Sequence, residues 1–213
     1  MSTVEPKEAR VSALRARILD AARRIVTREG IDGLSMRKIA DAIGYSPASL
    51  YLHFEGRDAI ARALGREGFI QLLARLQPCA EIDDTRARLH ALAHAYVAFG
   101  CAHPETYRLM FLPERAQGAP ERAEGPALEA RPDDEAAAIT QLFADAFAPV
   151  FAEPAPLARA LWALLHGVVA FSLAGPAFAP ESSRLLAIDA ALDGWIGTGA
   201  DADATQKTQP DAT

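Results

Sequence analysis

The chain has 213 residues, of which 50% are hydrophobic and 23% are charged, and its formal net charge is −6. This composition is typical of a soluble globular protein, and the lack of any unbroken run of about 18 apolar residues predicts that no segment spans a membrane. The first residues show no signal-peptide pattern, and Cys79 and Cys101 lack metal-ligand spacing, so we expect buried thiols in a reducing cytoplasm.

Charge is distributed unevenly along the chain. Residues 1–60 carry ten Lys or Arg and eight Asp or Glu, a net charge of +2, whereas the remainder carries −8. A basic head on an acidic body can bind phosphate groups with the head alone. The net negative charge therefore does not exclude nucleic acid as a partner.

The N-terminal part predicts four helices. Apolar residues at helical spacing indicate helices over residues 11–28, 36–43, 47–53 and 57–77. Ser35 and Ser46 are suitable N-caps, and Pro47 suits the first position of the third helix. Gly44 is a suitable stop for the second helix, because glycine tolerates the left-handed conformation.

The helical pattern continues to near the C-terminus. We expect helices over residues 83–102, 105–112, 133–151, 156–174 and 180–196. The segment 113–132 is rich in Pro, Gly, Glu and Arg and is predicted to be a mobile loop, and the polar tail 198–213 is predicted to be disordered. With no alternation typical of strands, the fold class is all-α, with about nine helices.

Residues 35–53 meet the requirements of a helix-turn-helix. Such a motif needs a small residue where two helices cross, a turn residue that tolerates positive φ, and a second helix that presents side chains to the major groove of DNA. Ala40 suits the crossing, Gly44 suits the turn, and residues 47–53 form the reading helix. The motif predicts a DNA-binding protein.

The amino-acid sequence of this segment resembles that of a known family. Leu34-Ser35-Met36-Arg37-Lys38-Ile39-Ala40, followed by Gly44-Tyr45-Ser46-Pro47-Ala48-Ser49-Leu50-Tyr51-Leu52-His53-Phe54, resembles the N-terminal domain of the TetR (tetracycline-repressor-like) family. Arg57 stands where lysine is more usual in that family. The resemblance implies a homodimer with a C-terminal ligand-binding and dimerisation domain. The implied organisation is a flexible arm (1–9), a helix-turn-helix domain (10–56), a regulatory domain (57–197) and the tail.

The resemblance also implies which residues contact operator DNA. They are Ser35, Arg37, Ser46, Pro47, Ala48, Ser49, Tyr51, His53 and Arg57. Pro47 and Ala48 offer apolar surface suited to thymine methyl groups, while the Tyr51 hydroxyl can reach a base or a phosphate. The other polar members include candidates for phosphate contacts, which fix register without reading sequence. Without the resemblance, Tyr51 and His53 would be interpreted as exposed helix residues.

The C-terminal part resembles a subgroup of the same family. Trp162, His166 and Gly167 match the tryptophan–histidine–glycine signature of the WHG-type regulatory domain. A lone histidine on an apolar helix is more often a hydrogen-bonded core or interface residue than a ligand, so we favour a structural role for His166. Gly167 within a helix suggests a close approach of another helix, within the chain or from a partner subunit.

Two residue sets remain as predictions for the regulatory domain. The candidate pocket lining is Phe69, Leu73, Tyr96, Phe99, Met110, Phe111, Phe143, Phe147, Trp162 and His166, although each also suits a core. Because this lining is chiefly apolar, a hydrophobic small molecule is the favoured effector. The candidate dimer interface is Leu161, Leu165, Val168, Leu185, Ile188, Leu192 and Trp195.

The predicted function is a homodimeric repressor that a small effector releases from a palindromic operator. The alternative is a DNA-binding protein of the same fold that a protein partner controls. His90 and His94 have the i, i+4 spacing of metal ligands on one helix face, but no catalytic motif accompanies them. A solvated or interface pair is the favoured interpretation, so we expect no enzyme, no cofactor and no metal.

Overall fold

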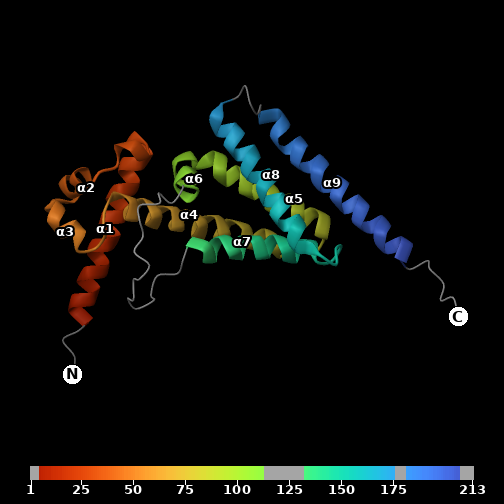
Figure 1. The fold of residues 1–213 in the computed structure, drawn as a ribbon, viewed down its shortest axis with the longest axis horizontal. Coiled ribbons are helices and arrows are strands. Elements are labelled where there is room, and N and C mark those ends of the chain that lie inside the picture. The colour runs from red at the N-terminus through yellow and green to blue at the C-terminus, as the bar shows by residue number, and fades with distance from the viewer. Residues whose placement is uncertain (1–4, 113–131, 176–180, 207–213) are drawn as a thin grey trace, which may run out of the picture. The chain divides into compact units, whose positions relative to one another are not determined.

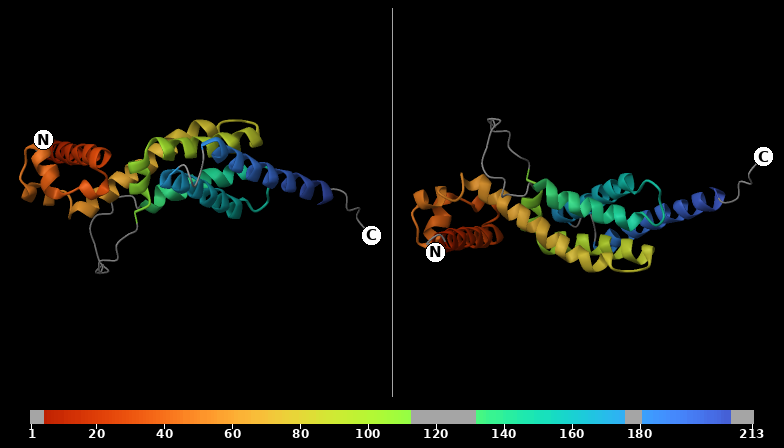
Figure 2. Two further views of the ribbon diagram at one scale, coloured as in Figure 1. Left: turned by 90° about the horizontal axis from the view of Figure 1, so that it is seen from above. Right: turned by 90° about the horizontal axis from the view of Figure 1, so that it is seen from below.

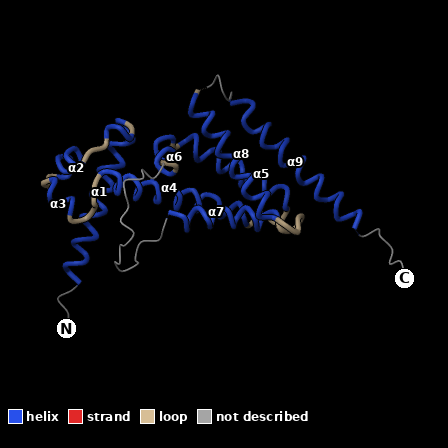
Figure 3. Tube along the Cα trace, viewed as in Figure 1, coloured by secondary structure: helices blue, strands red, loops and turns tan. Residues whose placement is uncertain are grey.

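The computed structural model describes residues 5–112, 132–175 and 181–206, and within these ranges all the regular elements are helices, joined by short loops and turns (Figures 1 and 3). The elements are α1 (Glu5–Glu29), a 3₁₀ turn η1 (Ile31–Gly33), α2 (Met36–Ile43), α3 (Pro47–Tyr51), α4 (Arg57–Ala80), α5 (Thr85–Ala102), α6 (Pro104–Met110), α7 (Pro132–Phe147), α8 (Pro154–Ala174) and α9 (Glu181–Gln206). The all-α fold class and its nine helices are confirmed for the described residues.

The chain divides into two compact units, and their boundary differs from the predicted one after residue 56. The first unit contains the residues up to Phe69 and the segment that begins at Pro104, and the second contains residues 70–103 and those from Asp133. The physical reason is that the first half of α4 belongs to the N-terminal core. Ile60 and Leu64 are buried there together with Leu109 of α6. Helix α4 therefore runs from one unit into the other.

The core of the first unit forms where α1 packs on α2, η1 and α6, and α2 packs on α3. Its fully buried centre includes Ile18, Ile39 and Leu50, and Phe54 closes it after α3. A Cβ atom on Gly65 would lie 2.6 Å from the carbonyl oxygen of Leu109, so glycine is required where α4 meets α6.

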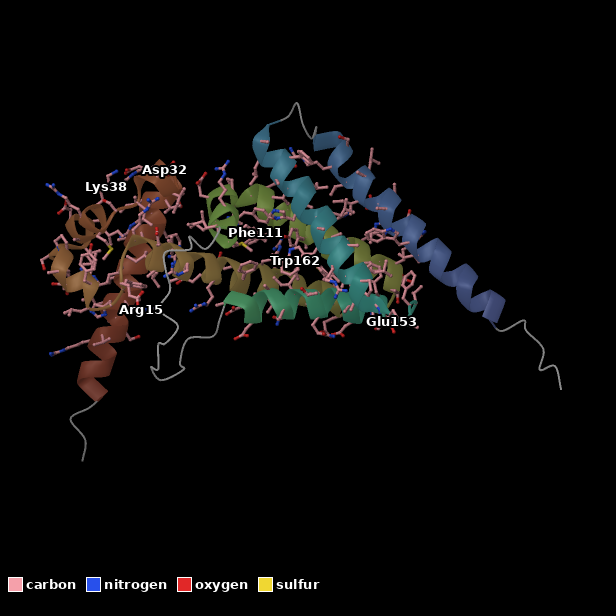
Figure 4. All side chains as sticks on the ribbon, viewed as in Figure 1. Arg15, Asp32, Lys38, Phe111, Glu153 and Trp162 are labelled. Atoms are coloured by element: carbon pink, nitrogen blue, oxygen red, sulfur yellow. The ribbon has the colours of Figure 1, made fainter. Side chains whose placement is uncertain are left out.

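The core of the second unit forms around α5, which packs against α8 and α9 (Figures 1 and 2). Tyr96, Phe143 and Phe147 are fully buried. The indole N–H of Trp162 on α8 (labelled in Figure 4) donates to the hydroxyl of Tyr96 on α5, with 2.8 Å between the two atoms. This bond satisfies the polar group of a buried tyrosine, as expected for an aromatic residue in a core.

Several helix ends differ from the sequence predictions. Helix α1 begins at Glu5 instead of residue 11, and α4 continues through Pro78 to Ala80. Pro78 lies in the last turn and has no N–H to donate to the carbonyl four residues earlier, yet the helix continues past it. Helix α9 continues to Gln206, past the end predicted at residue 196. The predicted loop lies, except for its last residue, outside the described residues, and so do residues 207–213 of the predicted tail.

The structure bears on two composition-based expectations. Helix α8 has 21 residues and includes an 18-residue window with a mean hydropathy of 1.6, so its length and composition would allow a membrane span although it contains no long unbroken apolar run. Here α8 packs against α5 and α9, and one helix of this kind is weak evidence for a membrane span. Cys79 and Cys101 are free, but they are half-buried instead of fully buried.

Candidate nucleic-acid interface and effector site

Local capping interactions build the helix-turn-helix as the sequence predicts. The Ser35 hydroxyl caps α2 by accepting a hydrogen bond from the Lys38 N–H at 3.2 Å. Gly44 ends α2 with φ 73° and ψ 36°, a conformation that a Cβ atom would strain. Ser46 caps α3 by accepting from the Ser49 N–H, and Pro47 occupies the first helical position. These signals fix the start of the reading helix.

The outward face of this motif carries the residues predicted to read bases. The side chain of Arg37 is 87% exposed, and its one ion-pair partner among the described residues is Asp41 at 3.9 Å. Tyr51 is 56% exposed, and Pro47 and Ala48 are also exposed. This face therefore combines a cation, a phenol and small apolar surface, which is the chemistry needed for contacts with phosphates and base edges.

Other predicted DNA contacts have partners within the fold. The hydroxyls of Ser46 and Ser49 lie 2.9 Å apart and hydrogen bond to each other. The carbonyl of the half-buried His53 accepts from Arg15 (labelled in Figure 4) at 3.1 Å. Arg57 donates to the carbonyl oxygen of Ile31 at 2.8 Å. These residues hold the motif together, and their contacts with DNA stay a prediction.

One carboxylate, that of Glu29, pairs with two cations near the motif. Lys38 Nζ lies 2.7 Å from a Glu29 carboxylate oxygen, and Arg28 lies 2.8 Å from the other (Lys38 is labelled in Figure 4). Hydrogen bonds from Lys38 and then Arg28 lower the pKa of Glu29, so this carboxylate stays charged. Because Glu29 occupies both cations, Arg37 is the better candidate for a phosphate contact.

Sequence reasoning missed two features of this unit. The first is Tyr45, which is partly exposed just before α3. The guanidinium carbon of Arg17 lies 5.2 Å from the centroid of the Tyr45 ring, and the Arg17 guanidinium also donates a hydrogen bond to the carbonyl of Ile43. An aromatic residue directly after the turn glycine was the available signal. A second feature is a hollow of about 250 Å³ lined by Arg15, His53, Phe54, Glu55, Ala59, Arg62, Ala63 and Arg66. No local pattern indicates this hollow, because its lining comes from separate segments.

Comparisons with known proteins agree with this geometry. Residues 18–64 match the description "Bacterial regulatory proteins, tetR family", and residues 89–194 match "Tetracyclin repressor-like, C-terminal domain". The chain belongs to the TetR family of transcriptional regulators. Members of this family bind operator DNA and are not enzymes. The match does not specify the WHG subtype, which stays a prediction.

Relatives with a name or a solved structure extend the comparison. The HTH-type transcriptional regulator YobS of Bacillus subtilis (strain 168) is 30% identical over 103 residues, which cover 48% of this chain and only 54% of YobS, about half its length. A protein of unknown function from Rhodococcus sp. RHA1 is 29% identical with a TM-score of 0.66, covering 87% of this chain and 94% of that one. AibR, solved with isovaleryl coenzyme A and operator DNA, has a TM-score of 0.58 at 19% identity and covers 86% of this chain and 96% of AibR. The AibR likeness shows the fold alone.

The regulatory unit of this TetR-family protein contains a cavity of about 540 Å³. It lies among the end of α4, the start of α5 and α7, and its lining is Leu73, Gln77, Ala80, Glu81, Arg88, Ala138, Gln141, Leu142, Asp145 and Ala146. Of the ten residues predicted from the sequence, only Leu73 lines it. Tyr96, Phe143 and Phe147 instead fill the core, because large aromatic side chains are buried most favourably there.

The remaining predicted pocket residues lie elsewhere. Phe99 is buried on α5, whereas Trp162 and His166 are half-buried on α8. The first unit contains Phe69, Met110 and Phe111. The rings of Phe69 and Phe111 pack edge to face, with 5.5 Å between their centroids (Phe111 is labelled in Figure 4). Burial lowers the pKa of His166, so this imidazole tends to stay neutral. Its role as a structural residue stays a prediction.

The predicted dimer residues fall into two groups. Leu161, Leu165, Ile188 and Leu192 are fully buried within the single chain, so their side chains have no surface to offer a partner. Val168 and Trp195 are half-buried, and Leu185 is exposed. The outward side of the same helices also carries Phe171, 58% exposed, and Leu186, 68% exposed. Periodicity identifies an apolar stripe but not which edge of it faces outward.

Proposed function

We propose that this regulator is a homodimeric repressor that reads a palindromic operator with α3 of each subunit. The observation that carries the proposal is the exposed face of the motif, which includes Arg37 and Tyr51. Among the described residues, the charge of Arg37 is paired only with the exposed carboxylate of Asp41, at 3.9 Å. Two such reading heads related by a two-fold axis would meet two half-sites about one helical turn apart.

The dimer part of the proposal is supported by apolar surface on α8 and α9. Phe171, Leu185 and Leu186 are large apolar side chains left exposed by the single chain. A Cβ atom on Gly167 would meet nothing within 4 Å among the described residues, so no described segment makes the close approach expected at this glycine. A partner helix that packs on Gly167 would supply it. A second copy of α8 and α9 is the simplest cover for this face, since isologous interfaces pair identical patches.

The effector part of the proposal is supported by the cavity in the second unit. Its volume, about 540 Å³, lies within the range of small-molecule sites. Its lining mixes aliphatic groups with Arg88, Gln141 and Asp145, so we propose an effector with both polar and apolar parts instead of the purely hydrophobic one predicted from the sequence. Helix α4 contributes to the cavity and continues into the DNA-binding unit, so it is the proposed transmitter.

Selection of bound sequences from random double-stranded DNA tests the repressor proposal. The expected result is a palindrome whose half-sites are spaced by about one helical turn, bound with two chains per site. Enrichment of a single unpaired half-site bound by one chain, or no enrichment at all, would contradict it. Sedimentation of the same protein without DNA measures whether the dimer forms before binding.

A separate experiment distinguishes the effector from control by a protein partner. Small amphipathic metabolites are screened for release of the protein from its selected operator, and active compounds are retested on Gln141→Trp, which fills the cavity. We expect this variant to keep operator affinity and to lose release. If no compound acts on either protein, or the variant responds like the parent, the cavity is not the effector site and control by a partner is favoured.

A further inference from the structure

Two histidines and an aspartate meet where α5 packs against α9. His90 Nδ1 lies 2.8 Å from Asp189 Oδ1, and His94 Nε2 lies 2.7 Å from the same oxygen. The three ligating atoms lie within 4.8 Å of one another. Sequence analysis found only the two histidines, because Asp189 follows about a hundred residues later and the packing of α9 on α5 brings it to them.

The surroundings of this cluster are organised as an outer shell. The second ring nitrogen of His90, Nε2, lies 2.9 Å from Asp193 Oδ1, and Arg86 lies 3.0 Å from that same oxygen. A metal-bound histidine commonly donates its other N–H to a carboxylate, which fixes the orientation of the ring. Asp193 is placed to accept this hydrogen bond, and Arg86 is placed to pair with the same carboxylate.

The charge of the cluster favours a cation. Asp189 and Asp193 contribute two carboxylates to the cluster, and Arg86 contributes one guanidinium group. A carboxylate beside two imidazole nitrogens supplies the negative charge and the lone pairs that a metal cation needs.

We propose that His90, His94 and Asp189 form a binding site for a divalent transition-metal ion of the zinc class. Two imidazole nitrogens and a carboxylate oxygen match the ligands that zinc accepts, with a fourth position left for water. Imidazole ligands disfavour magnesium and calcium, which prefer oxygen. Metal–ligand bonds of about 2.0–2.2 Å would replace the present hydrogen bonds by small movements of three partly exposed side chains.

Metal binding would join α5 to α9 across the packing of the second unit. An ion that binds the folded chain raises its stability as the free metal concentration rises above the dissociation constant. Because α9 also carries Leu185 and Leu186, the same ion would stiffen a helix of the proposed dimer face. The site itself does not depend on the proposed function.

The experiment uses tag-free, metal-stripped full-length protein titrated with Co²⁺ and with Zn²⁺. The expected result is one Co²⁺ per chain, with visible absorption typical of low-coordinate cobalt that Zn²⁺ displaces. His94→Ala and Asp189→Asn should each weaken binding by at least tenfold, and Asp193→Asn, which alters only the outer shell, by about tenfold. His103→Gln, an exposed histidine outside the cluster, should bind like the parent.

Folding is checked separately, so that loss of binding is not mistaken for loss of structure. Helical circular dichroism of each variant should match that of the parent, and the melting temperature of the parent, but not of Asp189→Asn, should rise with Zn²⁺ and fall again with a chelator. No stoichiometric Co²⁺ binding by the parent would overturn the proposal. Binding that persists unchanged in both His94→Ala and Asp189→Asn would also overturn it.

Discussion

Arg57 Nη2 donates a hydrogen bond to the main-chain carbonyl of Ile31, with 2.8 Å between the two atoms, and so ties the first turn of α4 to the 3₁₀ turn after α1. The exposed carboxylate of Asp32 lies 4.0 Å from the same guanidinium nitrogen (Asp32 is labelled in Figure 4). The residue predicted to contact phosphate is thus also a brace between two elements of the DNA-binding unit.

Replacing this arginine tests the brace. Arg57→Ala should lower the free energy of unfolding by about 0.5–1.5 kcal/mol, because one hydrogen bond to the Ile31 carbonyl is lost. Arg57→Lys should retain part of that stability, since an ammonium group can donate to the same oxygen. Urea unfolding measures both. Equal stability of Arg57→Ala and the parent would show that the brace contributes nothing.

The crossing of α4 and α6 gives a second prediction. Gly65→Ala should destabilise the chain by about 1–3 kcal/mol, because the new Cβ atom would lie 2.6 Å from the Leu109 carbonyl oxygen and the helices must separate. Gly194→Ala is the matched control, because an added Cβ atom at that position on α9 would meet no described residue within 4 Å. The control should be neutral or more stable by up to about 1 kcal/mol. Similar melting temperatures for the two variants would contradict the close approach.

The outward apolar face of α8 and α9 gives a third prediction. Phe171→Glu combined with Leu186→Glu should shift the protein toward monomer at micromolar concentration, because two charges would be buried in the proposed interface. The helical content should remain that of the parent, since both side chains are exposed in the single chain. Arg159→Ala, an exposed position on α8, is the control. Sedimentation velocity that finds the same dimer in all three proteins would place the interface elsewhere.

His166 gives a prediction about pH. Burial holds the pKa of His166 in the folded chain below its ordinary value of 6.5, so the unfolded chain binds a proton first as pH falls. The stability due to neutral His166 is therefore complete above pH 6.5 and decreases as the pH falls from there toward the lowered folded pKa.

Unfolding free energies at pH 7.5 and pH 5.5 test this sign. His166→Gln should show a smaller loss between the two conditions than the parent, while the control His103→Gln should lose as much as the parent. Equal losses of unfolding free energy in the parent and in His166→Gln would contradict the claim that the folded chain holds a neutral, partly buried imidazole.

The DNA-binding motif was predictable because its signals are local. Ser35, Gly44 and the Ser46-Pro47 pair define the ends of α2 and α3 within a few residues of sequence, and each occupies the expected position. The apolar periodicity of α2 was equally informative, since Met36, Ile39, Ala40 and Ile43 are all buried.

The regulatory unit was less predictable because its site depends on packing between distant segments. An aromatic side chain such as Phe143 suits a core and a pocket equally well, and only the arrangement of helices decides between them. The cavity is instead lined by residues that include Gln141 and Arg88, which no local sequence pattern singles out. The partner of His90 and His94 was missed for the same reason, since Asp189 lies on another helix.

The most direct test of the central claim, that the exposed face of α2 and α3 reads the operator, is the affinity of two single variants for the selected sequence. Arg37→Ala and Tyr51→Ala should each weaken binding by about 1–3 kcal/mol in fluorescence anisotropy at fixed salt. Arg75→Ala, an exposed arginine in the second unit, should bind like the parent, and all three should keep the parent's helicity and oligomeric state. Unchanged operator affinity in both Arg37→Ala and Tyr51→Ala would contradict the assignment of the reading surface.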